Sequence, residues 1–212
     1  MVSEQNSKFA PAGYGYGEIL PTIEANTDEE IKTALDTYLH KLKNNETMQI
    51  NISGGAETVT KGTSFCGTLT KTTYDYATFF VNGYLHKGCL LLLTKYGGVW
   101  GEWEWVNPPM IPGDEYRTTE RWMGKPVYTC LVNCGNPTIG VASTPHDLNI
   151  KQCISCEACS SISESLPVRY IDSSVDDTTL NAYANNNYVH VYTSGNYDLT
   201  CTIYARLRYT KN

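Results

Sequence analysis

A single helical pattern, from Thr27 to Lys43, limits this 212-residue chain to a fold with little helix. The segment reads TDEEIKTALDTYLHKLK, and Thr27 with Glu30 forms a capping box of the kind that starts helices. Apolar residues then recur at the spacing of one helix face, at Ile31, Ala34, Leu35, Tyr38, Leu39 and Leu42. Because a helix with one apolar face needs a partner, we expect it to lie against a β-sheet.

The segments after the helix predict that sheet. Short strand-like runs separated by Gly, Asn or Lys turns lie at Met48–Ser53, Phe65–Lys71, Thr78–Val81, Leu90–Thr94 and Trp100–Val106. The prolines at 108 and 109 then stop strand pairing, because proline has no amide proton to donate. We therefore predict an extended arm over residues 1–21 and a first domain, one helix on a short-stranded sheet, over residues 22–109.

Three tryptophans stand close together in WGEWEWV, at Trp100, Trp103 and Trp105. In one strand, Trp103 and Trp105 share a face, and Glu102 and Glu104 take the solvated face opposite. The indoles are either a ligand platform or part of the core beneath the helix. We favour the core, because few other residues of this domain bury a comparable area.

The second half predicts a different, all-β domain. Residues 110–116, with a proline and a glycine, have the composition of a linker between domains. Strand candidates follow at Lys125–Asn133, Asn149–Cys159, Pro167–Ile171, Tyr188–Tyr192 and Tyr197–Tyr209. We predict an antiparallel β-sandwich over residues 117–212, and hence a mainly β, α+β fold for the whole chain.

Charge and hydropathy exclude several classes of protein. With 16 basic and 22 acidic residues the net charge is -6, which argues against nucleic acid or an anionic membrane as a partner. The longest apolar run, Cys89–Leu93, is too short to insert into a bilayer. The start, MVSEQNSKFAPAGYG, has neither the basic nor the apolar region of a signal peptide. We therefore expect a protein made in a cytoplasm.

Cysteine and histidine supply the candidates for a metal site. Cys153, Cys156 and Cys159 follow a C-x-x-C-x-x-C spacing, and His190 would meet its symmetry mates if it lay on a trimer axis. On a regular strand, however, Cys156 faces away from the other two cysteines. We expect packed free thiols, a solvated His190, no metal and no cofactor, with a disulfide formed after release as an open alternative.

Sequence motifs favour binding over catalysis. The chain has no G-x-S-x-G, H-E-x-x-H or phosphate-loop motif, and its paired carboxylates are explained by a turn and a strand face, so we expect no enzyme. Aromatic and amide side chains in two turns suit the apolar faces and hydroxyls of sugars. These candidate receptor-binding residues are Tyr183, Asn185, Asn186, Asn187, Tyr188, Asn196, Tyr197 and Asp198. Asparagine also simply makes turns, and that interpretation stays equally open.

The first half resembles the pyocin knob domain of bacteriophage and R-type pyocin tail fibres. The arm GYGYG, the segment PTIEANT before the helix, and the final strand VWGEWEWVNPPM carry the resemblance. The run PGDEYRTTERWMGKPVYTCLVNCG is similar to the segment that follows such knobs in prophage tail proteins of anaerobic, gut-type bacteria. The resemblance covers Ala10 to Gly135 closely and the rest of the chain in outline, and the cluster of three cysteines departs from it.

The resemblance implies a receptor-binding part at the distal end of a phage tail or tail-like particle. It implies a homotrimer that attaches to other tail or baseplate proteins through the N-terminal arm and adheres to a bacterial surface glycan. The protein is then made in the host cytoplasm and located in the virion. A baseplate or head-fibre protein without a receptor, a tail-borne glycan hydrolase and a free-standing carbohydrate-binding module are the alternatives.

Overall fold

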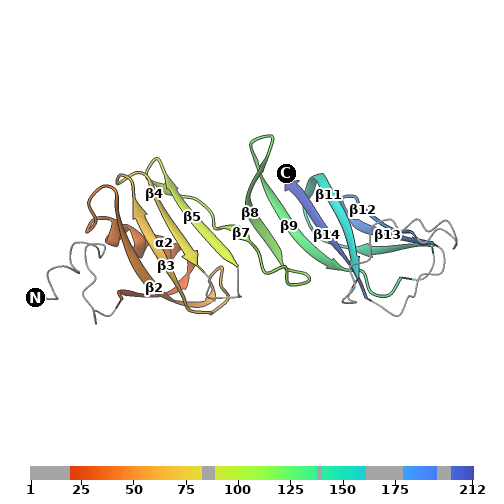
Figure 1. Ribbon diagram of the computed structural model, residues 1–212, viewed down its shortest axis with the longest axis horizontal. Helices are drawn as coiled ribbons and strands as arrows, with labels where there is room; N and C mark the ends of the chain where they lie inside the picture. The colour runs from red at the N-terminus through yellow and green to blue at the C-terminus, as the bar shows by residue number, and fades with distance from the viewer. Residues whose placement is uncertain (1–19, 83–88, 138–139, 161–178, 195–201) are drawn as a thin grey trace, which may run out of the picture. The chain divides into compact units, whose positions relative to one another are not determined.

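The computed structural model describes residues 20–82, 89–137, 140–160, 179–194 and 202–212. The chain divides into two compact units, Met1–Pro109 and Met110–Asn212 (Figure 1). The described residues are mainly β, and α2 is the one α-helix among them. Within the described ranges, no helix has the length and apolarity needed to cross a membrane.

The first unit is a sheet with a helix against one face (Figure 1). Its strands are β1 (Thr22–Thr27), β2 (Glu46–Glu57), β3 (Phe65–Lys71), β4 (Ala77–Asn82), β5 (Leu90–Tyr96), β6 (Val99–Trp100) and β7 (Glu104–Asn107). They pair in the order β1-β2-β3-β4-β5-β7, and β6 pairs with β5. Strand β1 runs parallel to β2 and was not predicted, because the sequence shows this segment only as the approach to the helix.

Helix α2 (Asp28–Leu39) begins where the sequence predicts. The Glu30 amide donates to Thr27 Oγ1 at 3.3 Å, which confirms the predicted cap. The Glu30 carboxylate in turn accepts from the amide of Asn26 at 2.6 Å. The first bond satisfies one of the backbone donors that the first turn of a helix leaves open, and the second binds the residue that precedes the cap.

The helix ends at Leu39, before the predicted Lys43, and its end is held by a side chain from the sheet. Lys71 Nζ donates to the carbonyls of Leu39 and Leu42, both at 2.8 Å. A cation bonded to the last carbonyls also complements the negative end of the helix dipole. Lys71 therefore fixes the C-terminal end of α2 on β3.

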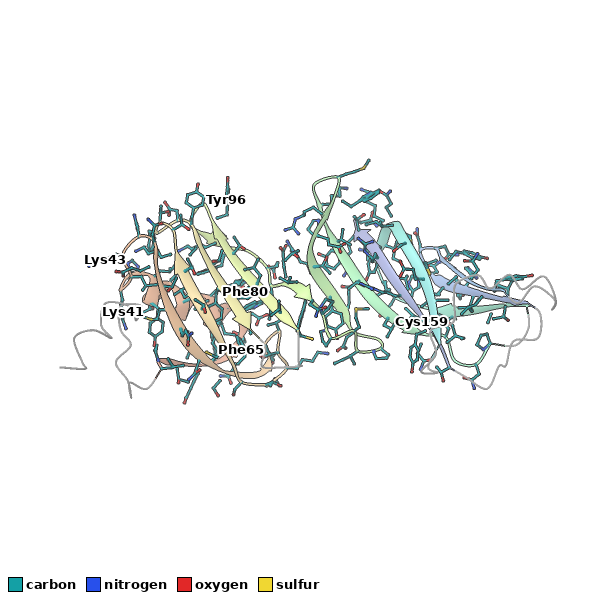
Figure 2. The ribbon with its side chains drawn as sticks, in the orientation of Figure 1. Lys41, Lys43, Phe65, Phe80, Tyr96 and Cys159 are labelled. Atoms are coloured by element: carbon teal, nitrogen blue, oxygen red, sulfur yellow. The ribbon has the colours of Figure 1, made fainter. Side chains whose placement is uncertain are left out.

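The core of the first unit lies between α2 and the sheet. Its fully buried apolar side chains are Ile31, Leu35, Leu39, Ile50, Ile52, Leu69, Phe79, Leu91 and Leu93. Trp103 and Trp105 are only 5% and 7% exposed, which confirms that these two indoles belong to the core. The Trp103 ring meets Phe65 and Phe79 edge-on, with ring centroids 6.1 and 6.2 Å apart (Phe65, Figure 2).

The prediction of one strand over Trp100–Val106 is wrong. Strand β6 ends at Trp100 and β7 begins only at Glu104. The cause is a tight turn at Gly97 and Gly98, with φ of 58° and 83°, which returns the chain onto β5 for two residues before it leaves again. Both short strands then pair with different parts of β5.

A buried ion pair ties α2 to β5. Lys95 Nζ lies 2.7 Å from Asp36 Oδ1, and the Lys95 side chain is 1% exposed. The same oxygen accepts from the Trp100 indole N–H at 2.8 Å. The ring centroid of Tyr74 lies 4.3 Å from Lys95 Nζ, so an aromatic face also stabilises the buried cation.

The second unit contains two antiparallel sheets. Its strands are β8 (Glu115–Trp122), β9 (Lys125–Asn133), β10 (Gly140–Pro145), β11 (Ile150–Ser160), β12 (Thr179–Ala184), β13 (Tyr188–Ser194) and β14 (Ile203–Lys211). One sheet has the order β8-β9-β14-β11 and the other the order β10-β13-β12.

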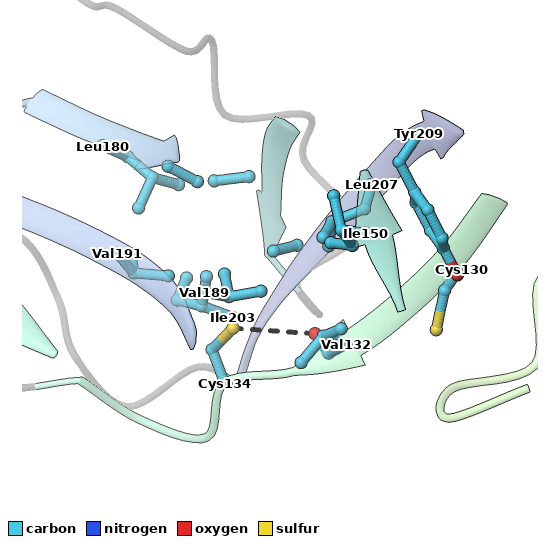
Figure 3. Close-up of a cluster of buried hydrophobic side chains, with 13 residues drawn as sticks. Cys130, Val132, Cys134, Ile150, Leu180, Val189, Val191, Ile203, Leu207 and Tyr209 are labelled. Atoms are coloured by element: carbon cyan, nitrogen blue, oxygen red, sulfur yellow. Dashed lines mark hydrogen bonds between the residues drawn. The ribbon is translucent and has the colours of Figure 1, made fainter. Parts of the chain in front are cut away.

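Both sheets contribute to one hydrophobic core (Figure 3). Strand β14 supplies Ile203, Ala205, Leu207 and Tyr209, all fully buried, which confirms the alternation predicted for this strand. The smaller sheet supplies Leu180, Ala182, Val189 and Val191. Within β12 and β13, the residues that alternate with these buried ones therefore face away from the core.

Three strands of the second unit were not predicted: β8, β10 and β12. Glu115 and Tyr116, assigned to a linker from the sequence, begin β8, and Tyr116 is buried. Strand β10, GVASTP, contains few residues with a preference for strands, and pairing with β13 decides its conformation. The strand predicted at Pro167–Ile171 lies outside the described residues.

Candidate functional site

The candidate site is the outward face of the sheet β10-β13-β12, which we call the tyrosine face. It consists of Asn181, Tyr183, Tyr188, His190, Tyr192, Val141, Ser143 and Pro145. Along β12 and β13, the residues of this set alternate with buried residues. Because successive side chains of a strand point to opposite faces, the set lies on the solvent side of the sheet. The face is therefore a consequence of how the two sheets share their core.

Strand register brings the face together in rows. Ser143, His190 and Tyr183 lie opposite one another across the three strands. Val141, Tyr192 and Asn181 form the next row. Directly opposite side chains contact each other in antiparallel sheets, so each row is a continuous surface.

Aromatic rings cover much of this surface. The rings of Tyr183 and His190 are stacked, with centroids 4.6 Å apart and an interplanar angle of 23°. Tyr188 lies two residues before His190 on β13, and the centroids of these two rings are 6.0 Å apart. Tyr183, Tyr188 and Tyr192 remain 53%, 43% and 42% exposed, and Val141 is 60% exposed. Exposed ring faces and phenol hydroxyls are thus presented side by side.

The hydrogen bonds of the face determine which of its atoms donate and which accept. Asn185 Oδ1 accepts from the backbone amides of Asn187 and Tyr188, at 2.9 and 2.8 Å, so its amide nitrogen must be the atom that points to His190. Asn185 Nδ2 lies 3.0 Å from His190 Nε2, which therefore accepts. In a neutral imidazole the proton is then on Nδ1, which donates to Ser143 Oγ at 2.8 Å.

The turn between β12 and β13 is anchored by His146. The His146 amide donates to the carbonyl of Asn187 at 2.9 Å, and His146 Nε2 lies 3.1 Å from the carbonyl oxygen of Asn185. The Asn185 amide also donates to the carbonyl of Tyr188 at 2.9 Å, closing the turn. A tight, bonded turn of this kind presents its side chains with little conformational freedom to lose on binding.

The three strands carry no aspartate, glutamate, lysine or arginine. Histidine aside, the groups offered by the tyrosine face are neutral rings, hydroxyls and amides. The net charge of -6 is thus located elsewhere in the chain. Such a surface suits a ligand with apolar faces and hydroxyl groups better than a strongly charged one.

The structure brings some of the predicted receptor-binding residues together. Tyr183, Asn185 and Tyr188 belong to the tyrosine face or its turn, and Asn186 and Asn187 are exposed on the same turn. Tyr183 was placed in the turn from the sequence but lies within β12, because the turn spans only residues 185–187. The second predicted group, Asn196, Tyr197 and Asp198, lies outside the described residues.

Sequence reasoning missed Val141, Ser143 and Tyr192 as part of the face. Tyr192 shares the parity of Tyr188 and His190 in YVHVY, and that alternation was a usable signal. Val141 and Ser143 gave none, because β10 was not recognised as a strand.

The three clustered cysteines lie on β11, but not with the predicted facing. A bulge between Cys153 and Ser155 shifts the register, so Cys153 and Cys156 pair with Tyr209 and Leu207 and both pack on the core. Cys159 pairs with Tyr204 and is exposed. The prediction that Cys156 faces away from the other two is therefore wrong.

Burial disfavours the thiolate form of these three cysteines. Burial, with smaller contributions from neighbouring groups, raises the pKa of Cys156 to about 12, and burial also raises the pKa of Cys153 and of Cys159. A metal binds the thiolate form, so it would have to displace the proton of each of these thiols. Across the described residues, no three His, Cys, Asp or Glu side chains gather as a metal site requires.

His190 is also engaged. Both its ring nitrogens have neighbours within 3.0 Å, Ser143 Oγ and Asn185 Nδ2. A metal ion would have to displace one of these two contacts to reach the imidazole. These contacts indicate that His190 links Ser143 and Asn185 within the tyrosine face.

Comparisons with known proteins give distant likenesses only. No family model matches the sequence, and no curated protein matches it. An N-truncated R2-type pyocin tail fibre is 8% identical, with 94% of this chain and 100% of that chain covered and a TM-score of 0.29. A C-terminal part of a P. aeruginosa R2 pyocin fibre is 8% identical, with 94% and 69% covered and a TM-score of 0.30.

A C-terminal part of a P. aeruginosa R1 pyocin fibre is 11% identical, with 92% of this chain and 68% of that chain covered and a TM-score of 0.28. Because all three TM-scores are low, we base no functional argument on these likenesses.

Proposed function

We propose that this protein is a receptor-binding tail-fibre protein of a phage or phage-tail-like particle, and that it adheres to a bacterial surface glycan through the tyrosine face. The observation that carries the glycan proposal is the row of Tyr183, His190 and Ser143, flanked by the exposed Tyr188 and Tyr192 on strands without Asp, Glu, Lys or Arg. Sugar rings stack their C–H faces on aromatic rings, and hydroxyl and amide groups bind their oxygens.

The assignment to a phage particle rests on the sequence resemblance. It is carried by GYGYG, by PTIEANT before the helix, and by VWGEWEWVNPPM. Under this proposal, residues 22–109 are a pyocin-knob-like domain, in which α2 covers one face of the sheet. Residues 117–212 are a β-sandwich formed by the two antiparallel sheets.

The mechanism we propose is multivalent adhesion. A homotrimer presents three tyrosine faces, and several fibres per particle multiply weak contacts into firm attachment without any single tight site. The N-terminal arm, residues 1–21, attaches the fibre to other tail or baseplate proteins. The protein is made in the host cytoplasm and carried in the virion. A light-scattering measurement that finds a monomer at micromolar concentration contradicts the trimer.

We propose binding without catalysis, because the three strands hold no carboxylate pair of the kind that hydrolyses glycosides. The test is an array of bacterial surface glycans probed with the fluorescently labelled full chain. Adhesion predicts binding to a subset of glycans and labelling of cells that carry them. No binding to any glycan or cell favours a structural virion protein instead. Release of reducing sugar from a bound glycan favours a hydrolase.

A further inference from the structure

The hydroxyl of Ser143 has a defined direction. Its oxygen accepts from His190 Nδ1–H, because Asn185 forces His190 Nε2 to accept. The hydroxyl proton of Ser143 is therefore available to another acceptor, and Ser143 is exposed. Among the described residues, Ser143 Oγ has no second hydrogen-bond partner. The chain from Asn185 through His190 thus leaves one oriented donor on the tyrosine face.

An apolar surface lies directly beside this donor. Val141 is two residues from Ser143 on the same strand, so both side chains project from the same face. Val141 is 60% exposed and lies opposite Tyr192 on β13. The ligand group that binds here meets a hydroxyl donor at one end and a methyl-lined, aromatic-flanked surface at the other.

The geometry points to an N-acetylated amino sugar as the preferred ligand, an inference that rests on the proposed function. An acetamido group has a carbonyl oxygen, which accepts from the Ser143 hydroxyl, and a methyl group, which packs on Val141 and Tyr192. A plain hexose lacks the methyl group. A free amino sugar presents an ammonium, and no carboxylate of these three strands balances its charge.

The experiment compares matched sugars on the full chain. Saturation-transfer NMR is recorded with the methyl glycosides of N-acetylglucosamine, N-acetylgalactosamine, glucose and glucosamine. We expect at least one acetylated sugar to bind, with its strongest saturation at the acetamido methyl, and the two sugars without an acetyl group to bind about tenfold more weakly, the effect of one lost hydrogen bond.

Three variants test the residues. Ser143→Ala removes the donor and is expected to lower the affinity for the acetylated sugar about tenfold. Ser143→Thr keeps the hydroxyl, so its affinity is expected to equal that of the wild type. Val141→Thr preserves the side-chain shape but adds a hydroxyl, and is expected to reduce saturation at the acetamido methyl. All three changes lie at exposed strand positions, so the fold is retained.

The outcomes separate this inference from the proposed function. Equal binding of acetylated and non-acetylated sugars, or unchanged binding by Ser143→Ala, overturns the preference for an acetamido group. If the glycan array still shows binding that depends on Tyr192, adhesion stands without that preference. If the wild type binds no glycan and labels no cell, the proposed function fails, and this inference fails with it.

Discussion

The side-chain amide nitrogen of Asn185 lies 3.0 Å from Nε2 of His190, and its oxygen is already bonded to two backbone amides. This one contact sets the tautomer of the histidine. It also joins the turn between β12 and β13 to the stacked pair of His190 and Tyr183. The turn and the tyrosine face therefore behave as one preorganised surface.

The tautomer is directly measurable. Two-dimensional ¹⁵N NMR of the imidazole at neutral pH is expected to show His190 with its proton on Nδ1. Asn185→Asp keeps the acceptor oxygen but replaces the donor with a second acceptor, so the proton is expected to move to Nε2 or both nitrogens to become protonated. An Nε2–H tautomer in the wild type contradicts the hydrogen-bond polarity described above.

The buried pair of Asp36 and Lys95 is expected to contribute to stability of the first unit. Asp36→Ala leaves the Lys95 cation buried without its carboxylate, and we expect a loss of about 3 kcal/mol in free energy of unfolding. This is the low end for such pairs, because 35% of the Asp36 side chain is exposed. Denaturant unfolding followed by tryptophan fluorescence measures it.

A matched control is the exposed partner in another ion pair. Glu29, whose side chain is 80% exposed, pairs with Lys32, whose side chain is only 8% exposed but also lies 4.0 Å from Glu102. Glu29→Ala therefore leaves this cation a second carboxylate and is expected to cost less than about 1 kcal/mol. Combining Asp36→Leu with Lys95→Met is expected to cost less than Asp36→Ala alone, since neither charge is then left buried. Equal losses for Asp36→Ala and Glu29→Ala argue against a stabilising buried pair.

Alkaline pH is expected to destabilise the second unit. Burial raises the pKa of Cys130 to about 11 and that of Cys156 to about 12, above the ordinary thiol value of 9.0. Above pH 9 the unfolded chain loses these protons first, so the free energy of unfolding falls as pH rises toward 12. Burial of Tyr116, whose pKa is raised to about 12, acts in the same direction.

Thermal unfolding between pH 8 and 11 measures this effect. Cys156→Ala is expected to reduce the pH dependence in the second unit, whereas Cys66→Ala, in the first unit, leaves it unchanged. A melting temperature of the second unit that does not change with pH contradicts the raised thiol pKa values.

Sequence patterns predicted those elements in which local chemistry and tertiary structure agree. Thr27 starts the helix, and β14 alternates as its sequence indicates, because a cap and a half-buried strand are local features. The end of α2 depends on Lys71, a residue distant in sequence, and could not be predicted from the helix itself.

The candidate site was predicted only in part, for the same reason. Asn185 and Tyr188 belong to a recognisable turn, but Ser143 reaches His190 through strand pairing across 47 residues of sequence. The facing of Cys153 and Cys156 depends on a bulge, which has no sequence signature here. Contacts between distant strands therefore decide most of the site.

The most direct test of the central proposal is the affinity of face variants for a glycan that the array identifies. We compare the wild type with Tyr183→Ala/Tyr192→Ala, and with Tyr96→Ala, which removes a 75% exposed tyrosine in the first unit (Tyr96, Figure 2). Glycan adhesion through the tyrosine face predicts a loss of about tenfold or more for the double variant, since each aromatic contact contributes roughly 0.5 to 1.5 kcal/mol. It predicts no change for Tyr96→Ala. Unchanged affinity in the double variant, or an equal loss in Tyr96→Ala, would contradict the proposal.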